Sequence, residues 1–266
     1  MTHTCRAITV ALLYLLIQAA GLHAQEVTVA AAADLQFAFQ DVAARFEKQS
    51  GAHVKLIFGS SGNFFAQLQN GAPFDLFFSA DVSYPQKLEA AGLTEPGTLY
   101  RYATGKIVLW VPKDSTLDLR RGLAVLLDPG VRKIAIANPE HAPYGRAAVA
   151  ALQHGKIYEQ TSSKFVVGEN ISQAASFVVS GSADAGIVAL SLALAPSMKE
   201  KGKYVEIPAS EYPPIEQAAV ILKSSAQKET ARRFLSFLKE PAILDLMRNY
   251  GFAVPGPDPS NPASPP

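Results

Sequence analysis

Residues 27–81 read VTVAAAADLQFAFQDVAARFEKQSGAHVKLIFGSSGNFFAQLQNGAPFDLFFSAD, and this stretch decides the fold. Short β-rich runs alternate in it with segments whose apolar residues recur at helical spacing, and Gly92 ends the last helical segment. We expect strands at 27–32, 53–58 and 75–78, and helices at 37–49, 64–69 and 82–91. This β-α-β-α-β order predicts a parallel sheet with right-handed crossovers.

A second alternating set begins near residue 106, which makes the chain an α/β protein with two sets of β/α units. We expect strands at 107–112, 132–137, 164–167, 185–188 and 218–222, and helices at 146–155, 172–180, 227–239 and 241–250. Two such sets predict two lobes that face each other across a cleft. Ligands of open α/β sheets bind at the carboxyl ends of strands, so the strand-to-helix loops are the candidate site.

The N-terminal segment predicts export. Arg6 precedes an apolar run of about 16 residues, which is shorter than the roughly 20 that span a membrane, and Ala24 offers a cleavage point. We expect residues 1–24 to be a cleaved signal peptide and the mature protein to be periplasmic. Cys5 is the only cysteine, so the mature chain has no disulfide and no cysteine metal site.

The mature chain has no charge excess. Cleavage removes Arg6 and no acid, so the 24 Lys and Arg of the whole chain, against 23 Asp and Glu, become an even balance. The scattered charges exclude the basic stripe of a nucleic-acid-binding protein. Residues 256–266 are rich in proline and serine and predict a disordered tail.

Four strand-to-helix loops carry small residues, hydroxyls or amides where a helix is expected to start. They are AAADL (31–35), GSSGN (59–63), NPEHAPYG (138–145) and GENIS (168–172). Unpaired N–H groups in the first turn of a helix, together with the helix dipole, favour an anion. Each loop taken alone is explained as an ordinary helix cap. The four together predict anion capture by neutral dipoles.

At these loops the chain resembles the periplasmic molybdate-binding proteins of ABC importers, over about residues 26–255. The resemblance is carried by VTVAAAADL (27–35), FGSSGNFFAQLQNGAPFDLFFSAD (58–81), NPEHAPYG (138–145), ADAGIV (183–188) and YGF (250–252). It implies a two-lobed type II periplasmic-binding-protein fold with a ligand cleft between lobes joined by a two-crossing hinge. It places one lobe at 25–104 plus 217–255 and the other at 105–216.

The resemblance also implies a function. The protein would be a monomeric, non-enzymatic receptor that captures molybdate, and also tungstate, without a cofactor and delivers it to the permease of an ABC importer. Ser61 would donate through its hydroxyl and its N–H, and Tyr144 and Ile171 through backbone N–H groups. Asp34 occupies the remaining position of the ligand-binding set.

Two positions depart from the family pattern. Asp34 stands where many members have serine or asparagine, and a carboxylate has no hydrogen to give. We therefore expect the Asp34 N–H to face the ligand while the carboxylate caps the helix. Ala189 stands where some members have a tyrosine that touches the anion, and either the Tyr144 hydroxyl or water could replace it.

Several other interpretations are open. The site could bind sulfate, phosphate or a phosphonate, and an inward Asp34 carboxylate would favour phosphate. An enzyme or sensor on the same fold is a further alternative, although GxSxG and HExxH motifs are absent. His141 is read as an exposed loop residue. Glu216 with Asp34 could complete a metal shell, but we prefer a hinge-region hydrogen bond for Glu216.

Overall fold

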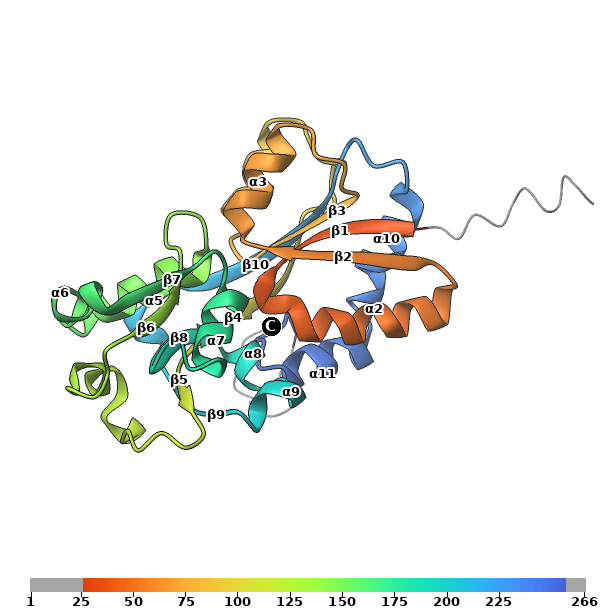
Figure 1. The fold of residues 1–266 in the computed structure, drawn as a ribbon. Helices are drawn as coiled ribbons and strands as arrows, with labels where there is room; N and C mark the ends of the chain where they lie inside the picture. Colours follow the sequence, from red (N-terminus) through yellow and green to blue (C-terminus); the bar gives the residue numbers. More distant parts are fainter. Residues whose placement is uncertain (1–25, 257–266) are drawn as a thin grey trace, which may run out of the picture.

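The computed structural model describes residues 26–256, and its strands form two five-stranded sheets (Figure 1). The expected signal peptide and all but the first residue of the expected tail lie outside the described residues. The first sheet has the order β2 (His53–Gly59), β1 (Glu26–Ala32), β3 (Leu76–Ser79), β10 (Ile215–Ile221), β4 (Tyr100–Gly105). The second has the order β7 (Phe165–Gly168), β6 (Ile134–Ala137), β8 (Ala185–Ala189), β5 (Ile107–Pro112), β9 (Gly202–Glu206).

The expected α/β fold with two lobes is confirmed, and so is the parallel pairing of its first three strands. β1 pairs in parallel with β2 and with β3, and β6 pairs in parallel with β7 and β8. Both sheets are nevertheless mixed. β10 runs antiparallel to β3 and β4, and β5 runs antiparallel to β8 and β9.

Helices cover the sheets of both lobes. The first lobe carries α2 (Gln36–Ser50), α3 (Ser61–Gln69), α4 (Ser83–Ala90), α10 (Lys228–Phe237) and α11 (Pro241–Asn249). The second carries α5 (Pro143–His154), α6 (Tyr158–Thr161), α7 (Ile171–Val179), α8 (Leu190–Ala193) and α9 (Pro196–Lys199). Short 3-10 helices are η1 (Ala33–Leu35), η2 (Leu119–Leu127), η3 (Ser162–Lys164) and η4 (Ala209–Glu211). α2 buries the apolar face that its spacing predicts and ends at Gly51, whose φ of 70° is left-handed.

Two strands were not predicted, β4 and β9. β9 lies at the edge of its sheet and all five of its residues are partly or fully exposed, so its sequence GKYVE has no alternation of apolar and polar residues. β4 mixes tyrosines with Arg101 and glycine and has no apolar run. β10 begins directly after Pro213 and Pro214, three residues before the expected start.

The chain passes between the lobes at two places, from β4 to β5 and from η4 to β10. Gly105 ends β4 at the first of these crossings. A Cβ atom on Gly105 would lie 2.1 Å from the Tyr144 hydroxyl oxygen, so the crossing strand can pass Tyr144 only with glycine there. The second-lobe helix α5 is therefore packed directly against the hinge.

The core of the first lobe is built on a group of aromatic rings around Phe39. The Phe39 ring meets Phe78 edge to face at a centroid distance of 4.8 Å and Phe234 at 6.2 Å, and all three side chains are fully buried. These rings join α2, β3 and α10, which are distant in sequence. Packing between them holds the β1–α2 loop in place.

Phe39→Ala is expected to lower the free energy of unfolding by about 3–5 kcal/mol, because it leaves a cavity among three rings. Urea unfolding followed by circular dichroism measures this loss. Phe37→Ala on the same helix, where the side chain is only partly buried, is the matched control and should cost clearly less. A loss below about 1 kcal/mol for Phe39→Ala would contradict this role of the ring.

Candidate anion-binding site

The starts of four helical segments meet around one small cavity between the lobes. η1 and α3 approach from the first lobe, and α5 and α7 approach from the second. The residues that line the cavity are Ala32, Ala33, Asp34, Gly59, Ser60, Ser61, Ala80, Ala142, Pro143, Tyr144, Asn170 and Ile171. All four residues expected in the site, Asp34, Ser61, Tyr144 and Ile171, are thus brought together.

The helix caps leave backbone donors free for a ligand. Asn170 caps α7 by accepting from the N–H groups of Ser172 and Gln173, at 3.0 and 3.1 Å. Ser60 caps α3 by accepting from the Asn63 N–H at 3.4 Å. First-turn N–H groups have no acceptor within their own helix. Among the described residues, no loop or side-chain acceptor takes the N–H of Ser61, Tyr144 or Ile171.

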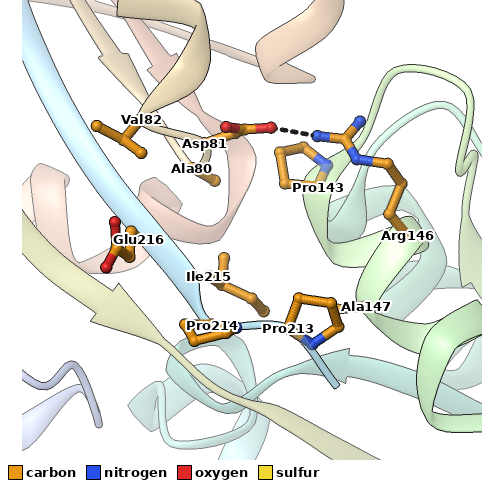
Figure 2. A pocket seen from close by; sticks show the side chains of 10 residues that line it. All are labelled: Ala80, Asp81, Val82, Pro143, Arg146, Ala147, Pro213, Pro214, Ile215 and Glu216. Atoms are coloured by element: carbon orange, nitrogen blue, oxygen red, sulfur yellow. Dashed lines mark hydrogen bonds and ion pairs between the residues drawn. The ribbon is translucent and has the colours of Figure 1, made fainter. Parts of the chain in front are cut away.

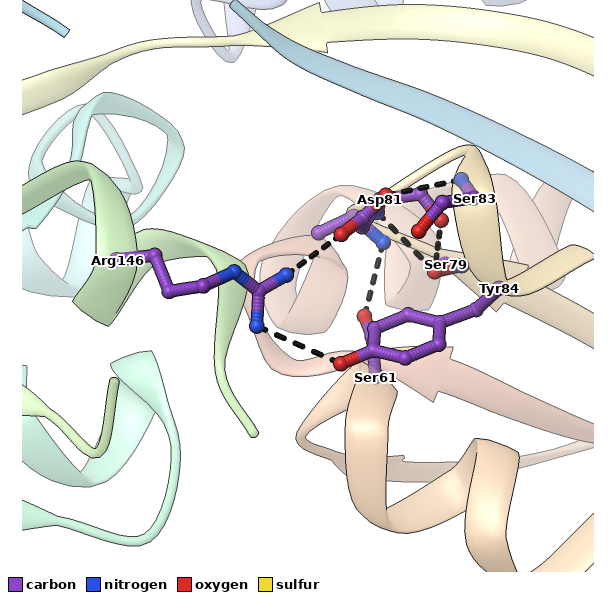
Figure 3. Close-up of polar contacts among 7 residues, drawn as sticks. Ser61, Ser79, Asp81, Ser83, Tyr84 and Arg146 are labelled. Carbon is purple, nitrogen blue, oxygen red and sulfur yellow. Dashed lines mark hydrogen bonds and ion pairs between the residues drawn. The ribbon is translucent and has the colours of Figure 1, made fainter. Parts of the chain in front are cut away.

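The Ser61 hydroxyl is oriented as a donor. Its oxygen accepts a hydrogen bond from the Ala80 N–H at 2.9 Å, in a fully buried contact (Figure 3). A hydroxyl that already accepts from an amide can turn its hydrogen elsewhere, and no described acceptor takes it. Ser61 therefore offers both its O–H and its N–H to the cavity.

The expected position of the Asp34 carboxylate is wrong. The N-cap of η1 is Ala32, and no side chain caps η1 or α2. Instead Asp34 Oδ2 accepts from the Tyr144 hydroxyl at 2.9 Å and from Gln217 Nε2 at 2.7 Å. These donors come from the other lobe and from the hinge strand β10, and sequence spacing alone did not place either of them beside residue 34.

The same contacts show whether the Tyr144 hydroxyl replaces the tyrosine that some family members have at position 189. The one hydrogen of the Tyr144 hydroxyl is given to Asp34, so the hydroxyl does not replace that tyrosine as a donor to the cavity. Ala189 is fully buried and does not line the cavity. Ser191, just beyond it, donates its hydroxyl to the Asp34 carbonyl oxygen at 2.7 Å and adds a further contact between the lobes.

Burial dominates the electrostatics of this network. It raises the pKa of Asp34 from 3.8 to about 6, against the opposing effect of hydrogen bonds from Gln217, from Tyr144 and from the backbone N–H of Asp34 itself. Burial, together with the charge of Asp34, also holds the pKa of the Tyr144 and Tyr102 phenols well above 10. Both phenols are therefore neutral donors at physiological pH.

His141 lies beside Ser60, which lines the cavity, and is not the exposed loop residue expected from sequence. Its side chain is 19% exposed, and Nδ1 lies 2.8 Å from the Ser60 hydroxyl oxygen. The His141 carbonyl oxygen accepts from the Gly62 N–H at 2.9 Å. Beside it, the Asn63 side-chain amide donates to Glu169 across the lobes. This cluster fastens the α3 loop to the second lobe.

A second inter-lobe contact is an ion pair between Arg146 of α5 and Asp81, with 2.5 Å between Nη2 and Oδ2 (Figure 2). Arg146 also donates to the Tyr84 hydroxyl at 3.4 Å (Figure 3). The pair borders a groove of about 380 Å³ that shares Ala80 and Pro143 with the small cavity. Asp81 directly follows Ala80, whose N–H orients Ser61, so the ion pair fixes the loop that holds this donor in place.

The alternative of a carboxylate metal shell is not supported. Glu216 lines the groove rather than the small cavity, and it pairs with Arg101 of β4 at 2.6 Å. The preferred hinge-region hydrogen bond of Glu216 is thus confirmed. Among residues 26–256, no group of three or more His, Cys, Asp or Glu side chains is placed to hold a metal ion.

The model of the bacterial extracellular solute-binding protein family matches residues 27–253. The chain belongs to this family. It is 40% identical over 236 residues to the molybdate-binding protein ModA of Azotobacter vinelandii, covering 89% of this chain and 93% of that protein. It is 38% identical over 251 residues to ModA of Rhodobacter capsulatus, covering 94% of this chain and 97% of that protein.

A solved structure of a molybdate-binding protein has the same fold. The periplasmic molybdate-binding protein of Azotobacter vinelandii superposes with a TM-score of 0.82 at 38% identity, covering 86% of this chain and all of that one. These relatives are binding proteins rather than enzymes. Within the described residues, no helix is long and apolar enough to cross a membrane.

Gly62→Ala is expected to weaken binding of molybdate, the anion after which these relatives are named. A Cβ on residue 62 would lie 2.6 Å from the His141 carbonyl oxygen and would separate the α3 loop from the second lobe. Loss of this hydrogen bond between the lobes corresponds to about a tenfold rise in Kd. Isothermal titration calorimetry measures it, with Gln67→Ala on the exposed face of α3 as the matched control. An unchanged Kd in Gly62→Ala would contradict this role of the contact.

Proposed function

We propose that this chain captures molybdate, and also tungstate, in the periplasm and delivers it to the permease of an ABC importer. The observation that carries the proposal is the convergence of backbone donors from both lobes and the Ser61 hydroxyl on one cavity without a cation. The family match and the identity to molybdate-binding proteins support the choice of ligand. We propose that capture needs no cofactor and no catalysis.

The chemistry of capture is the exchange of water for fixed dipoles. Helix N-termini favour negative charge, and their N–H groups replace the water that a dianion loses on entering the cleft. The donors belong to short loops that caps and inter-lobe contacts hold rigid. A smaller tetrahedral anion such as sulfate cannot reach all of them at once, so we propose selection by size. Tungstate and molybdate are nearly equal in size and charge and are expected to bind alike.

Closure of the lobes is the proposed signal to the permease. Contacts at His141, Arg146 and Tyr144 join the two lobes, and of these three residues Tyr144 lines the cavity itself. A bound anion supplies further bonds to both lobes and so favours the closed form. We propose that the mature protein acts as a monomer.

Hydrogen phosphate is the second candidate ligand. The observation in its favour is Asp34 Oδ1, a buried acceptor without a hydrogen-bond partner in the described part of the chain. A protonated anion could donate to this oxygen, whereas molybdate is fully deprotonated at neutral pH and has no hydrogen to give. The two candidate ligands therefore differ in whether the hydrogen between Asp34 Oδ1 and the anion comes from the anion or from the protein.

Calorimetric titration of residues 25–266 with molybdate, tungstate, sulfate and phosphate is the test of function. We expect tight binding of molybdate and tungstate, with Kd values at least a hundredfold below that for sulfate, because sulfate misses donors of the rigid cage. Tight phosphate binding without molybdate binding would replace the proposed ligand by the second candidate. Binding of none of the four would refute the oxyanion function.

Ser61→Ala is expected to raise the Kd for molybdate by about ten- to a hundredfold. A hydrogen bond to a charged group contributes about 1.5–3 kcal/mol, and this variant removes one while it leaves the backbone donor. Ser176→Ala, an exposed serine of α7, is the matched control and should bind as the unchanged protein does. Equal affinity in Ser61→Ala would show that the hydroxyl does not touch the anion.

A further inference from the structure

Asp34 is a buried acid in a cavity that otherwise suits an anion. It is 1% exposed, and the cavity it lines contains no Lys, Arg or His among its described residues. An ionised carboxylate next to a dianion is repelled by it, and the cavity offers no cation to balance the two. The dipoles of the helix starts therefore do not by themselves explain how an acid and an anion can share this cavity.

The hydrogen bonds around Asp34 match those of a neutral carboxylic acid. Both donors from other residues, the Tyr144 hydroxyl and Gln217 Nε2, go to Oδ2, while Oδ1 is buried and no other described residue donates to it. A protonated carboxyl group has one carbonyl oxygen that accepts and one O–H that donates. Oδ2 then serves as the carbonyl oxygen, and Oδ1 is the atom that is available to carry the hydrogen.

Charged groups on the neighbouring elements are engaged elsewhere. On α5 and the loop before it, Arg146 pairs with Asp81, and His141 contacts Ser60 and Glu169. On the crossing strands, Glu216 of β10 pairs with Arg101 of β4. The titratable groups that reach the network directly are the phenols of Tyr144 and Tyr102, the latter donating to Gln217 Oε1 at 2.8 Å.

From this arrangement we propose that molybdate capture takes up one proton, which the Asp34 carboxylate holds on Oδ1 so that the acid donates to the bound anion. The proposal rests on the proposed function. One proton from solvent joins one carboxylate as the lobes close, and opening returns it with the anion. Asp34 then replaces, as a neutral donor, the serine or asparagine that many members have at this position.

The pH dependence of Kd follows from the difference between the pKa of Asp34 in the open protein and in the bound protein. Burial in the closed protein already raises its pKa to about 6, and a bound dianion raises that pKa further. With the lobes apart, water lowers the pKa toward its ordinary value. Because the bound form has the higher pKa, binding is favoured at low pH and weakens as the pH rises. Between the pKa values of the open and bound forms, Kd rises about tenfold per pH unit.

The experiment measures protons and affinity together. Calorimetric titration with molybdate at pH 7, in buffers of different ionisation enthalpy, gives the number of protons taken up, and titrations from pH 6 to 8 give the slope of log Kd. We expect close to one proton and a slope near one for the unchanged protein. Infrared difference spectra on adding molybdate should show a carboxylate converted to a carboxylic acid.

Matched variants assign the proton. Asp34→Asn, which is neutral and of the same shape, should bind with no proton uptake, a flat pH profile and no carboxylic acid signal. Asp41→Asn should keep all three, since Asp41 is an exposed acid that accepts from Tyr250 at 2.7 Å, away from the cavity. His141→Gln should also keep the proton uptake and the carboxylic acid signal, because the proposal places the proton on Asp34 and not on the histidine that contacts Ser60.

Three results would overturn the proposal. Molybdate binding without proton uptake in the unchanged protein would show that Asp34 stays ionised, and would leave the proposed function intact. Uptake that persists in Asp34→Asn and vanishes in His141→Gln would assign the proton to the histidine. No molybdate binding at any pH would overturn the function itself, and the coupling with it. If Asp34→Asn does not fold, the infrared spectrum of the unchanged protein decides by itself.

Discussion

The hydrogen bond from the Tyr144 hydroxyl to Asp34 joins the two lobes at the cavity, and much of the surrounding structure depends on it. Gly105 has to be glycine because the hinge strand passes beside this hydroxyl. Gln217 of the other crossing strand is fixed by donating to both partners, at 2.7 Å to Asp34 and 3.0 Å to Tyr144. Helix α5, whose first turn carries a donor of the site, is thereby held against both strands of the hinge. The contacts that join the lobes and the residues that form the site are therefore the same.

The charge balance of the cavity explains how Asp34, an acid, can take part in this hydrogen bond beside a bound anion. Two unit charges about 4 Å apart interact by about 4 kcal/mol at an effective dielectric constant of 20, so an ionised Asp34 would cost a dianion roughly twice that. Helix N-termini act as about half a positive charge each, which offsets a dianion but not a third negative charge. A neutral Asp34 removes the conflict and adds a donor. Charge neutrality and donor count thus favour the same protonation state.

The sequence predicted the scaffold better than the polar network. Runs such as LFFS in β3 and the apolar face of α2 are set by local spacing, so the strands, helices and strand-to-helix loops were predicted nearly where they lie. The four donor loops could be predicted because helix starts are a local signal. The partners of Asp34 could not, since Tyr144 is 110 and Gln217 183 positions away. A carboxylate beside a helix start is usually a cap, and only the three-dimensional contacts show that here it is not.

Size and protonation discriminate between different anions in this site. Sulfate and molybdate are both dianions, so a neutral Asp34 repels neither, and the rigid donors must separate them by reach. Hydrogen phosphate carries an O–H that needs an acceptor in the site. When Asp34 is protonated, its Oδ1 is a donor and no longer an acceptor, so this O–H has no partner there. The acid that would recognise hydrogen phosphate when ionised rejects it when protonated. The protonation state of Asp34 therefore sets which class of oxyanion the closed site accepts.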